Sequence, residues 1–135
     1  MNCLFCKIIT RELPAEVLFE DNDVIVILDI NPMNYGHALV IPKEHSENFL
    51  ETAPGLSEKL FEISKSMAKI IKMSIEADGI NIVCNNGSAA GQTVFHTHIH
   101  IIPRMNNDEF QFHLNLKKYT HNQLSEYGQL IRKSL

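Results

Sequence analysis

The sequence predicts a single domain in which an antiparallel sheet is combined with one long helix. Two features predict the elements: short β-branched runs alternate with turn residues, and one long stretch repeats its apolar residues at helical spacing. The chain has 135 residues, of which 44% are hydrophobic, and a chain of this size usually folds around one core. We therefore expect residues 1–135 to form one domain with one active site per chain.

Strands dominate the first part of the chain. A helical turn is predicted over residues 4–9 and a first strand over residues 16–20. After a turn of Asp and Asn residues, the nearly continuous apolar run of residues 24–30 is typical of a strand covered on both faces. A loop of Asn, Pro and Gly residues then leads into a third strand, residues 37–42. The two hairpin-like connections indicate an antiparallel sheet.

The long amphipathic helix is predicted over residues 56–76. Its apolar positions recur at steps of three and four residues: Leu56, Leu60, Ile63, Met67, Ile70, Ile71 and Ile75. Thr52 or Ser57 can cap the beginning of this helix, and Gly79 ends it.

The second half of the chain contains two more predicted strands. They cover residues 80–84 and 93–102, and a glycine-bearing loop, residues 85–92, separates them. A short C-terminal helix is predicted over residues 124–131. Residues 105–118 have no clean periodicity, and no element is assigned there.

The composition excludes several classes of protein. The net charge is −4 and no Lys/Arg-rich run occurs, which argues against long nucleic acids as partners. No apolar run reaches the length of about 20 residues that spans a bilayer, and the N-terminus lacks the pattern of a signal peptide. We therefore expect a cytoplasmic protein with no membrane partner. Three cysteines, an odd number, favour thiol or metal roles over a disulfide framework.

Three histidines alternate along the predicted fifth strand. Because strand side chains alternate between faces, His96, His98 and His100 project from one side. The residues between them occupy the other face and can be buried. Several ionisable rings in one row are costly to desolvate, so the row indicates a chemical role rather than an ordinary polar face.

Two chemistries fit such a row. The first is a metal site, in which two or three imidazoles bind Zn or Fe. Its cupin-like version would require a carboxylate shortly downstream, which residues 101–104 do not supply. The second is phosphorus chemistry: a neutral imidazole attacks an α-phosphate and forms a nucleotidyl enzyme, and a neighbouring imidazole assists the leaving group and then water.

Two further features favour a nucleotide. The small residues, glycines and hydroxyls of residues 86–93 allow successive backbone N–H groups to face an anion. Asp29 follows a wholly apolar run, and its carboxylate can accept both ribose hydroxyls. Each feature also has a simpler interpretation, as a mere turn or as an aspartate that fixes the start of a loop.

A pair of cysteines stands near the N-terminus. Cys3 and Cys6 have the C-x-x-C spacing that lets two thiolates bind one tetrahedral ion. A redox pair would instead be expected after a strand and at the start of a helix in a βαβ unit. Cys84 lies within an apolar strand and is interpreted as a small buried hydrophobe.

The residues from His96 to Ile102, His-Thr-His-Ile-His-Ile-Ile, resemble the signature of the histidine triad (HIT) family, His-φ-His-φ-His-φ-φ, with Thr97 more polar than usual. Other segments resemble family segments in the same order: residues 28–32, 36–45 and 85–95. The resemblance covers most of residues 3–104.

The resemblance implies an α+β, HIT-like fold with a five-stranded antiparallel sheet per subunit and pairing into a homodimer. It also implies a cleft for a purine nucleotide of the AMP type, with adenine favoured. The implied activity is hydrolysis of adenosine phosphoramidates, acyl adenylates or dinucleoside polyphosphates. The third histidine is intact, as in the hydrolase branches, whereas the uridylyltransferases have glutamine there. The tryptophan-bearing C-terminus of the animal branch is missing, since the chain has no tryptophan.

The resemblance also implies roles for single residues. His98 would be the nucleophile, His100 would contact the scissile phosphate and bridging atom, and His37 would support them. Residues expected to hold the ribose and the phosphate are Asp29, Ile30, Asn85, Gly91, Gln92 and Thr93. In many bacterial members the cysteine pair joins two histidines around a structural zinc, and the matching residues here are Cys3, Cys6, His45 and His96. No catalytic cofactor is implied.

Two alternatives to this hydrolase stay open at the level of the sequence. The chain could be a purine-nucleotide-binding regulator whose slow turnover is incidental, because the same pocket serves both functions. It could also be a metal-dependent enzyme that uses the histidine row as ligands, in which case chelators would abolish its activity.

Overall fold

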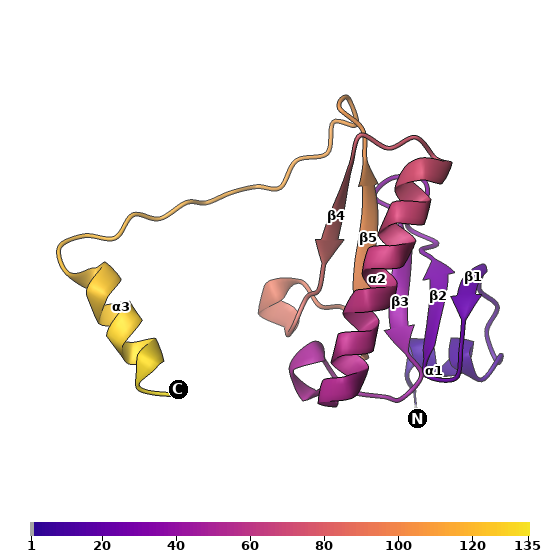
Figure 1. Cartoon of the computed structure of the whole chain (residues 1–135), viewed down its shortest axis with the longest axis horizontal. Coiled ribbons are helices and arrows are strands. Elements are labelled where there is room, and N and C mark those ends of the chain that lie inside the picture. Colours follow the sequence, from indigo (N-terminus) through magenta and orange to yellow (C-terminus); the bar gives the residue numbers. More distant parts are fainter. Residues whose placement is uncertain (1) are drawn as a thin grey trace.

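The computed structural model describes residues 2–135, and within this part of the chain the strands form one five-stranded antiparallel sheet (Figure 1). The strands are β1 (Val17–Glu20), β2 (Val24–Leu28), β3 (Ala38–Pro42), β4 (Gly79–Val83) and β5 (Ile99–Arg104). Their order in the sheet is β1-β2-β3-β5-β4, and every neighbouring pair is antiparallel. The predicted five-stranded α+β fold is therefore confirmed.

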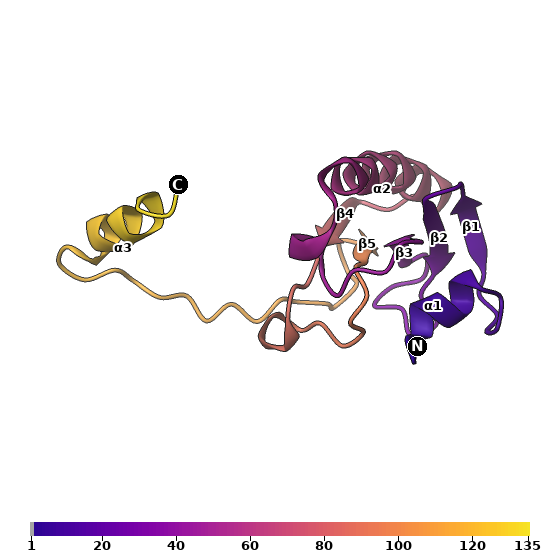
Figure 2. The same cartoon turned by 90° about the horizontal axis from the view of Figure 1, so that it is seen from below.

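Helices cover both faces of the sheet. The long helix α2 (Pro54–Ser74) packs on one face and the short α1 (Leu4–Ile9) on the other, as Figure 2 shows. The remaining helices are α3 (Gln123–Arg132) and two 3-10 turns, η1 (Phe49–Glu51) and η2 (Ser88–Ala90). The long helix begins earlier than predicted because Pro54, whose fixed φ suits a first helical turn, starts it. Its N-cap is Ala53, so neither Thr52 nor Ser57 caps it, and Gly79 opens β4 instead of ending the helix.

The sheet has an apolar core on each face. Alternate residues of β2 face opposite ways, so Val24 and Val26 pack beneath α2, whereas Ile25 and Ile27 pack against α1. All four are almost completely buried, and each contributes about 1.5–3 kcal/mol through its burial. The prediction that this strand is covered on both faces is therefore confirmed.

The fifth strand is shorter at its beginning than predicted. The sequence pattern placed it at residues 93–102, but β5 covers Ile99–Arg104, so His96 and His98 precede it and only His100 lies within it. The reason is that the backbone before β5 bonds to a loop: the Thr97 amide donates to the carbonyl of Ser46 at 2.8 Å. The expected burial of the intervening residues is confirmed, since Thr97, Ile99 and Ile101 are buried.

A charged cluster fixes the point where the C-terminal segment leaves the sheet. The Arg104 guanidinium binds both carboxylate oxygens of Asp108 at 2.7 and 3.0 Å, and Asn34 donates to the same carboxylate. Beyond this cluster the chain runs without helix or strand to α3, which stands apart from the sheet in both views (Figures 1 and 2). None of the helices in residues 2–135 is long and apolar enough to cross a membrane.

Candidate active site and metal centre

A cavity of about 560 Å³ opens on the face of the sheet that carries α1. Most of its lining is apolar: Leu4, Phe5, Ile8, Leu13, Pro14, Ala15, Ile27, Leu28, Ile30, Leu39 and Val94. The polar lining residues are Asp29, Asn31, Thr93, His98 and His100. The cavity therefore combines a large apolar surface with a few ionisable and hydrogen-bonding groups, the composition typical of a small-molecule site.

His37 and His100 form a hydrogen-bonded pair beside this cavity. His37 Nδ1 accepts the backbone N–H of Met33 at 3.1 Å, so a neutral His37 carries its proton on Nε2. That nitrogen lies 2.9 Å from Nδ1 of His100, which must then accept. A neutral His100 is thereby left with its proton on Nε2, as a donor.

His98 has the opposite arrangement. Its Nδ1 lies 2.7 Å from the backbone carbonyl oxygen of His96, and because a carbonyl only accepts, Nδ1–H is the donor and Nε2 carries the lone pair. The ring is held edge-on by Phe5 and His100, with centroids 5.0 and 4.8 Å away. His98 therefore presents a nucleophilic nitrogen next to a ring that presents an N–H.

Burial keeps these rings neutral. It lowers the pKa of His37 and His98 below the usual 6.5 and, with help from the neighbouring histidines, lowers the pKa of His100 to about 4. The Asp29 carboxylate, 3.7 Å from Nε2 of His37, opposes the effect only in part. Near pH 7 the three rings are therefore uncharged, which a nucleophilic imidazole requires.

Cys3, Cys6, His45 and His96 form a second cluster, which includes the N-cap residue of α1 and Cys6 of the same helix. Their ligand atoms all lie within 4.8 Å of one another. Nδ1 of His96 is 3.4 Å from Cys3 Sγ, 3.6 Å from Cys6 Sγ and 3.1 Å from Nδ1 of His45. Ligands of a tetrahedral zinc ion with these donors are separated by about 3.3–3.8 Å. The donor set and its spacing therefore fit zinc.

The hydrogen bonding of His96 also suits a metal ligand. Its Nε2–H donates to the carbonyl oxygen of Pro42 at 2.8 Å, which leaves the Nδ1 lone pair facing the cluster. The ring is completely buried. His96 thus belongs to this cluster, whereas His98, two residues later, belongs to the cavity.

A third group, Asp29, His37 and His100, is also compact enough to surround an ion. However, Nδ1 of His37 accepts the Met33 amide, so Nε2 of a neutral His37 carries a proton and has no lone pair for a metal ion. The geometry therefore favours a hydrogen bond from His37 to His100 over a metal site at this position.

The side chain of Gln92 holds the glycine-bearing loop in place. The buried Gln92 accepts from the Gly87 amide at 2.8 Å and donates to the carbonyls of Glu47 and Val94 at 2.7 and 3.1 Å. Asn85, Gly91 and Gln92 lie outside the cavity lining, whereas Thr93 is part of it. The structure therefore does not place the first three at the cavity, and their contact with a phosphate stays a prediction.

The wall formed by α1 was missed from the sequence. Phe5 and Ile8 are buried residues of α1 that line the cavity, and Leu13 to Ala15 line it from the following loop. The only signal was the three-residue spacing of Phe5 and Ile8 beside the cysteine pair, which indicates one face of a helix.

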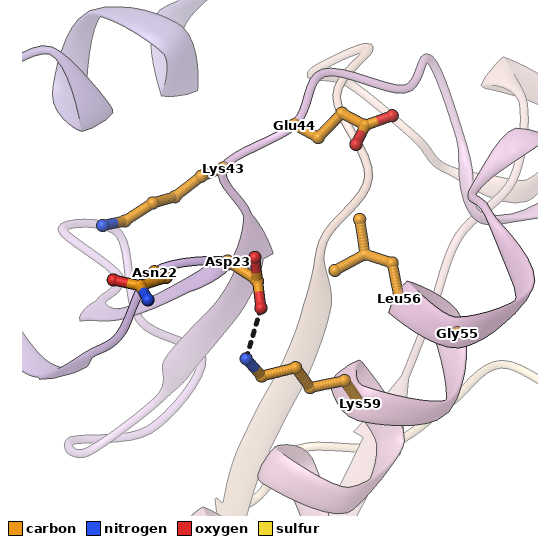
Figure 3. A pocket seen from close by; sticks show the side chains of 7 residues that line it. All are labelled: Asn22, Asp23, Lys43, Glu44, Gly55, Leu56 and Lys59. Carbon is orange, nitrogen blue, oxygen red and sulfur yellow. Dashed lines mark hydrogen bonds and ion pairs between the residues drawn. The ribbon is translucent and has the colours of Figure 1, made fainter.

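A second hollow, of about 340 Å³, lies between the ends of β2 and β3 and the beginning of α2 (Figure 3). Its Lys59 pairs with Asp21 and Asp23 at 2.8 and 2.6 Å, and Lys43 pairs with Glu20 at 2.9 Å. Its cations are compensated and its lining contains neither histidine nor cysteine, so it is not the candidate active site.

Comparison with known proteins identifies the family. The sequence model described as HIT domain matches residues 10–107. This chain belongs to the HIT family. An uncharacterized HIT-like protein of Borreliella burgdorferi is 48% identical over 82% of this chain and 81% of its own length. The adenylylsulfatase HINT3 of Arabidopsis thaliana is 39% identical over 96% of this chain and 66% of its own length.

Solved structures of HIT proteins share the fold. A HIT family member from Bacillus subtilis matches with a TM-score of 0.92 and 38% identity, covering 100% of this chain and 98% of that one. A zinc-bound histidine triad family protein from Mycobacterium smegmatis matches with a TM-score of 0.79 and 37% identity, covering 98% of this chain and 92% of that one. The predicted family and HIT-like fold are confirmed, whereas the single domain over residues 1–135 stays a prediction.

Proposed function

We propose that this HIT protein is a nucleotidyl hydrolase that cleaves adenosine phosphoramidates, acyl adenylates or dinucleoside polyphosphates at the α-phosphate. The observation that carries the proposal is that two histidines with opposite tautomers line one cavity. His98 presents the lone pair of its Nε2, and His100 presents the proton on its Nε2. The adenylylsulfatase among the relatives supports an activity on a nucleotide derivative.

The first step would form a covalent intermediate. Nε2 of His98 attacks the α-phosphorus and forms a P–N bond, while the bond from phosphorus to the leaving group breaks. His100 Nε2–H donates a hydrogen bond to the atom that bridges phosphorus and the leaving group and stabilises the charge that develops there, and a leaving group that needs a proton takes it from solvent. The positive charge that develops on the His98 ring is stabilised by the His96 carbonyl, which accepts the Nδ1–H.

The second step would restore the enzyme. Water attacks the same phosphorus and releases its proton to solvent, and the P–N bond breaks with its electron pair returning to Nε2 of His98, which releases AMP. His37 would hold His100 in the required tautomer throughout, because its Nε2–H donates to His100 Nδ1. His37 is therefore a positioning residue in this scheme.

The cavity lining suits the remaining parts of the substrate. The Asp29 carboxylate would accept the ribose hydroxyls, with Ile30 beside it and the apolar lining against the purine base. The Thr93 hydroxyl would bind phosphate, together with Asn85, Gly91 and Gln92 from the preceding loop.

The cysteine and histidine cluster would hold a structural zinc ion. The fit of its four ligand atoms and the zinc-bound relative support this proposal. Each step described above uses only side chains of this chain and water, so the reaction is proposed to need no catalytic cofactor.

We further propose a cytoplasmic homodimer. None of the residues of α3 is buried, and its apolar residues include Leu124, Tyr127, Leu130 and Ile131, each more than half exposed. Exposed apolar surface of this kind marks an interaction site, and a second copy of the chain would cover it.

The test is AMP release from an adenosine phosphoramidate by purified protein, by His98→Ala and by chelator-treated wild type. His113→Ala, a change of an exposed histidine in the C-terminal segment, is the matched control. Multiple turnovers that His98→Ala reduces by about 10⁴-fold or more support the proposal. Release that survives in His98→Ala, or that disappears on chelation at saturating substrate without loss of fold, would favour metal chemistry. Turnover no faster than a single slow cycle would favour a nucleotide-binding regulator.

A further inference from the structure

The short helix α1 takes part in two sites at once. Its N-cap residue Cys3 and its own Cys6 belong to the metal-binding cluster. Leu4, Phe5 and Ile8 of the same helix line the cavity. The metal-binding cluster and the nucleotide cavity therefore share one wall.

This wall cannot be stable by itself. A helix of six residues is far below the length at which isolated helices form in water. Its position depends on the packing of Phe5 and Ile8 against the sheet, and on the two cysteines. Their sulfurs contact the ring nitrogens of His45 and His96 at 3.4–3.6 Å, distances at which thiols form only weak hydrogen bonds.

Phe5 connects the two sites directly. Its ring is only 4% exposed and stands edge-on to both His96, with centroids 5.9 Å apart, and His98, with centroids 5.0 Å apart. One of these histidines belongs to the metal-binding cluster and the other is the proposed nucleophile. Any displacement of α1 would therefore change both the cavity and the packing around His98.

We propose that metal binding at Cys3, Cys6, His45 and His96 holds α1 as a wall of the nucleotide cavity, with Phe5 as its positioning residue. The metal site then controls nucleotide affinity without touching the nucleotide. This inference rests on the proposed function for the identity of the ligand. If α1 is correctly placed only about a tenth of the time in the metal-free protein, the apparent affinity for nucleotide falls about tenfold.

The experiment compares zinc-loaded and metal-free wild type with two readouts. AMP affinity is measured by calorimetry, and hydrogen exchange is measured at residues 3–10 and in β2 and β3. Metal removal should weaken AMP binding by about tenfold and speed exchange at residues 3–10 while β2 and β3 stay protected. Unchanged affinity with unchanged exchange at residues 3–10 would overturn the inference. Exchange that rises equally in β2 and β3 would also overturn it, because the metal would then stabilise the whole fold.

The Phe5→Ala variant tests the role of α1 in nucleotide binding while all four metal ligands stay in place. Phe5→Ala keeps all four ligands and should retain zinc while binding AMP more weakly, and Phe5→Leu should recover most of the affinity by refilling the space. Lys7→Ala, on the same helix but outside the cavity lining, should bind zinc and AMP as wild type does. Phe5→Ala with zinc and full AMP affinity would contradict the role of Phe5. If zinc-loaded wild type binds no AMP, the proposed function fails, and exchange at residues 3–10 alone decides this inference.

Discussion

Nε2 of His37 lies 2.9 Å from Nδ1 of His100, and this contact decides where the protons of both rings reside. The Met33 amide occupies the other nitrogen of His37, so the direction of the hydrogen bond from His37 to His100 is set by the backbone. The donor that His100 offers to a substrate is therefore a consequence of a residue more than sixty positions earlier in the chain.

Removing the His37 ring should impair the chemical step. We expect His37→Leu to lower kcat by about 10–100-fold, with a much smaller change in KM, because His100 would no longer be held in the donor tautomer. His37→Gln, whose amide can still donate, should recover part of the rate. Steady-state kinetics on an adenosine phosphoramidate measures both constants, and a change confined to KM would contradict this positioning role.

The stability of the protein should fall on mild acidification. The pKa of His100 is about 4 in the folded state, lowered chiefly by burial, against about 6.5 in the unfolded chain. Between these values the unfolded state binds more protons, so the free energy of unfolding decreases as pH falls, by up to about 1.4 kcal/mol per pH unit for this group. Urea unfolding at pH 7.5, 6 and 5 measures the slope, which should become shallower in His100→Gln. An identical slope in that variant would count against a buried neutral His100.

Zinc binding should depend on the two N-terminal cysteines and not on the third. Cys3→Ser and Cys6→Ser should each reduce the zinc content from about one ion per chain to well below it, because a hydroxyl is a poor zinc ligand. Cys84→Ser is the control, because the Cys84 thiol is not part of the cluster and donates to the His98 carbonyl oxygen at 3.5 Å instead. Elemental analysis of the dialysed proteins decides, and equal zinc in all of them would contradict the assigned ligands.

The core beneath α2 should be sensitive to truncation. Leu60 is completely buried in this core, so Leu60→Ala should lower the free energy of unfolding by about 2–5 kcal/mol. Leu50→Ala removes the same atoms from a side chain that is 79% exposed. It should change the free energy of unfolding by less than about 0.5 kcal/mol. Denaturant unfolding of both variants compares them, and a similar loss in each would be inconsistent with this packing.

The exposed apolar face of α3 should matter for assembly. We expect wild type to sediment as a dimer, and Leu130→Glu to shift it toward monomer, because a charge on that face would be costly to bury in an interface. Glu126→Gln changes a charge on the same helix without adding one to its apolar face and should leave the dimer intact. Sedimentation velocity at several concentrations distinguishes these outcomes, and a monomeric wild type would contradict the proposed homodimer.

The strand and helix patterns were readable because they depend on local periodicity. The double-sided burial of residues 24–27 follows from their β-branched side chains, and α2 follows from its three- and four-residue repeat. The beginning of β5 was misplaced because the residues around His96 alternate like a strand but bond to the loop at Ser46. That loop is brought there only by the folding of distant parts of the chain.

The sequence by itself determined the family, the fold class and the residue types able to carry the chemistry, because these follow from side-chain identity at fixed spacing. Only the tertiary structure assigned His96 to one cluster and His98 to the other, and showed which ring nitrogen each presents. Those assignments depend on the backbone carbonyls of Pro42 and His96, and on the helix α1, which contributes residues to both the cluster and the cavity. Hydrogen-bond partners of this kind come from the three-dimensional path of the chain, which residue spacing does not encode.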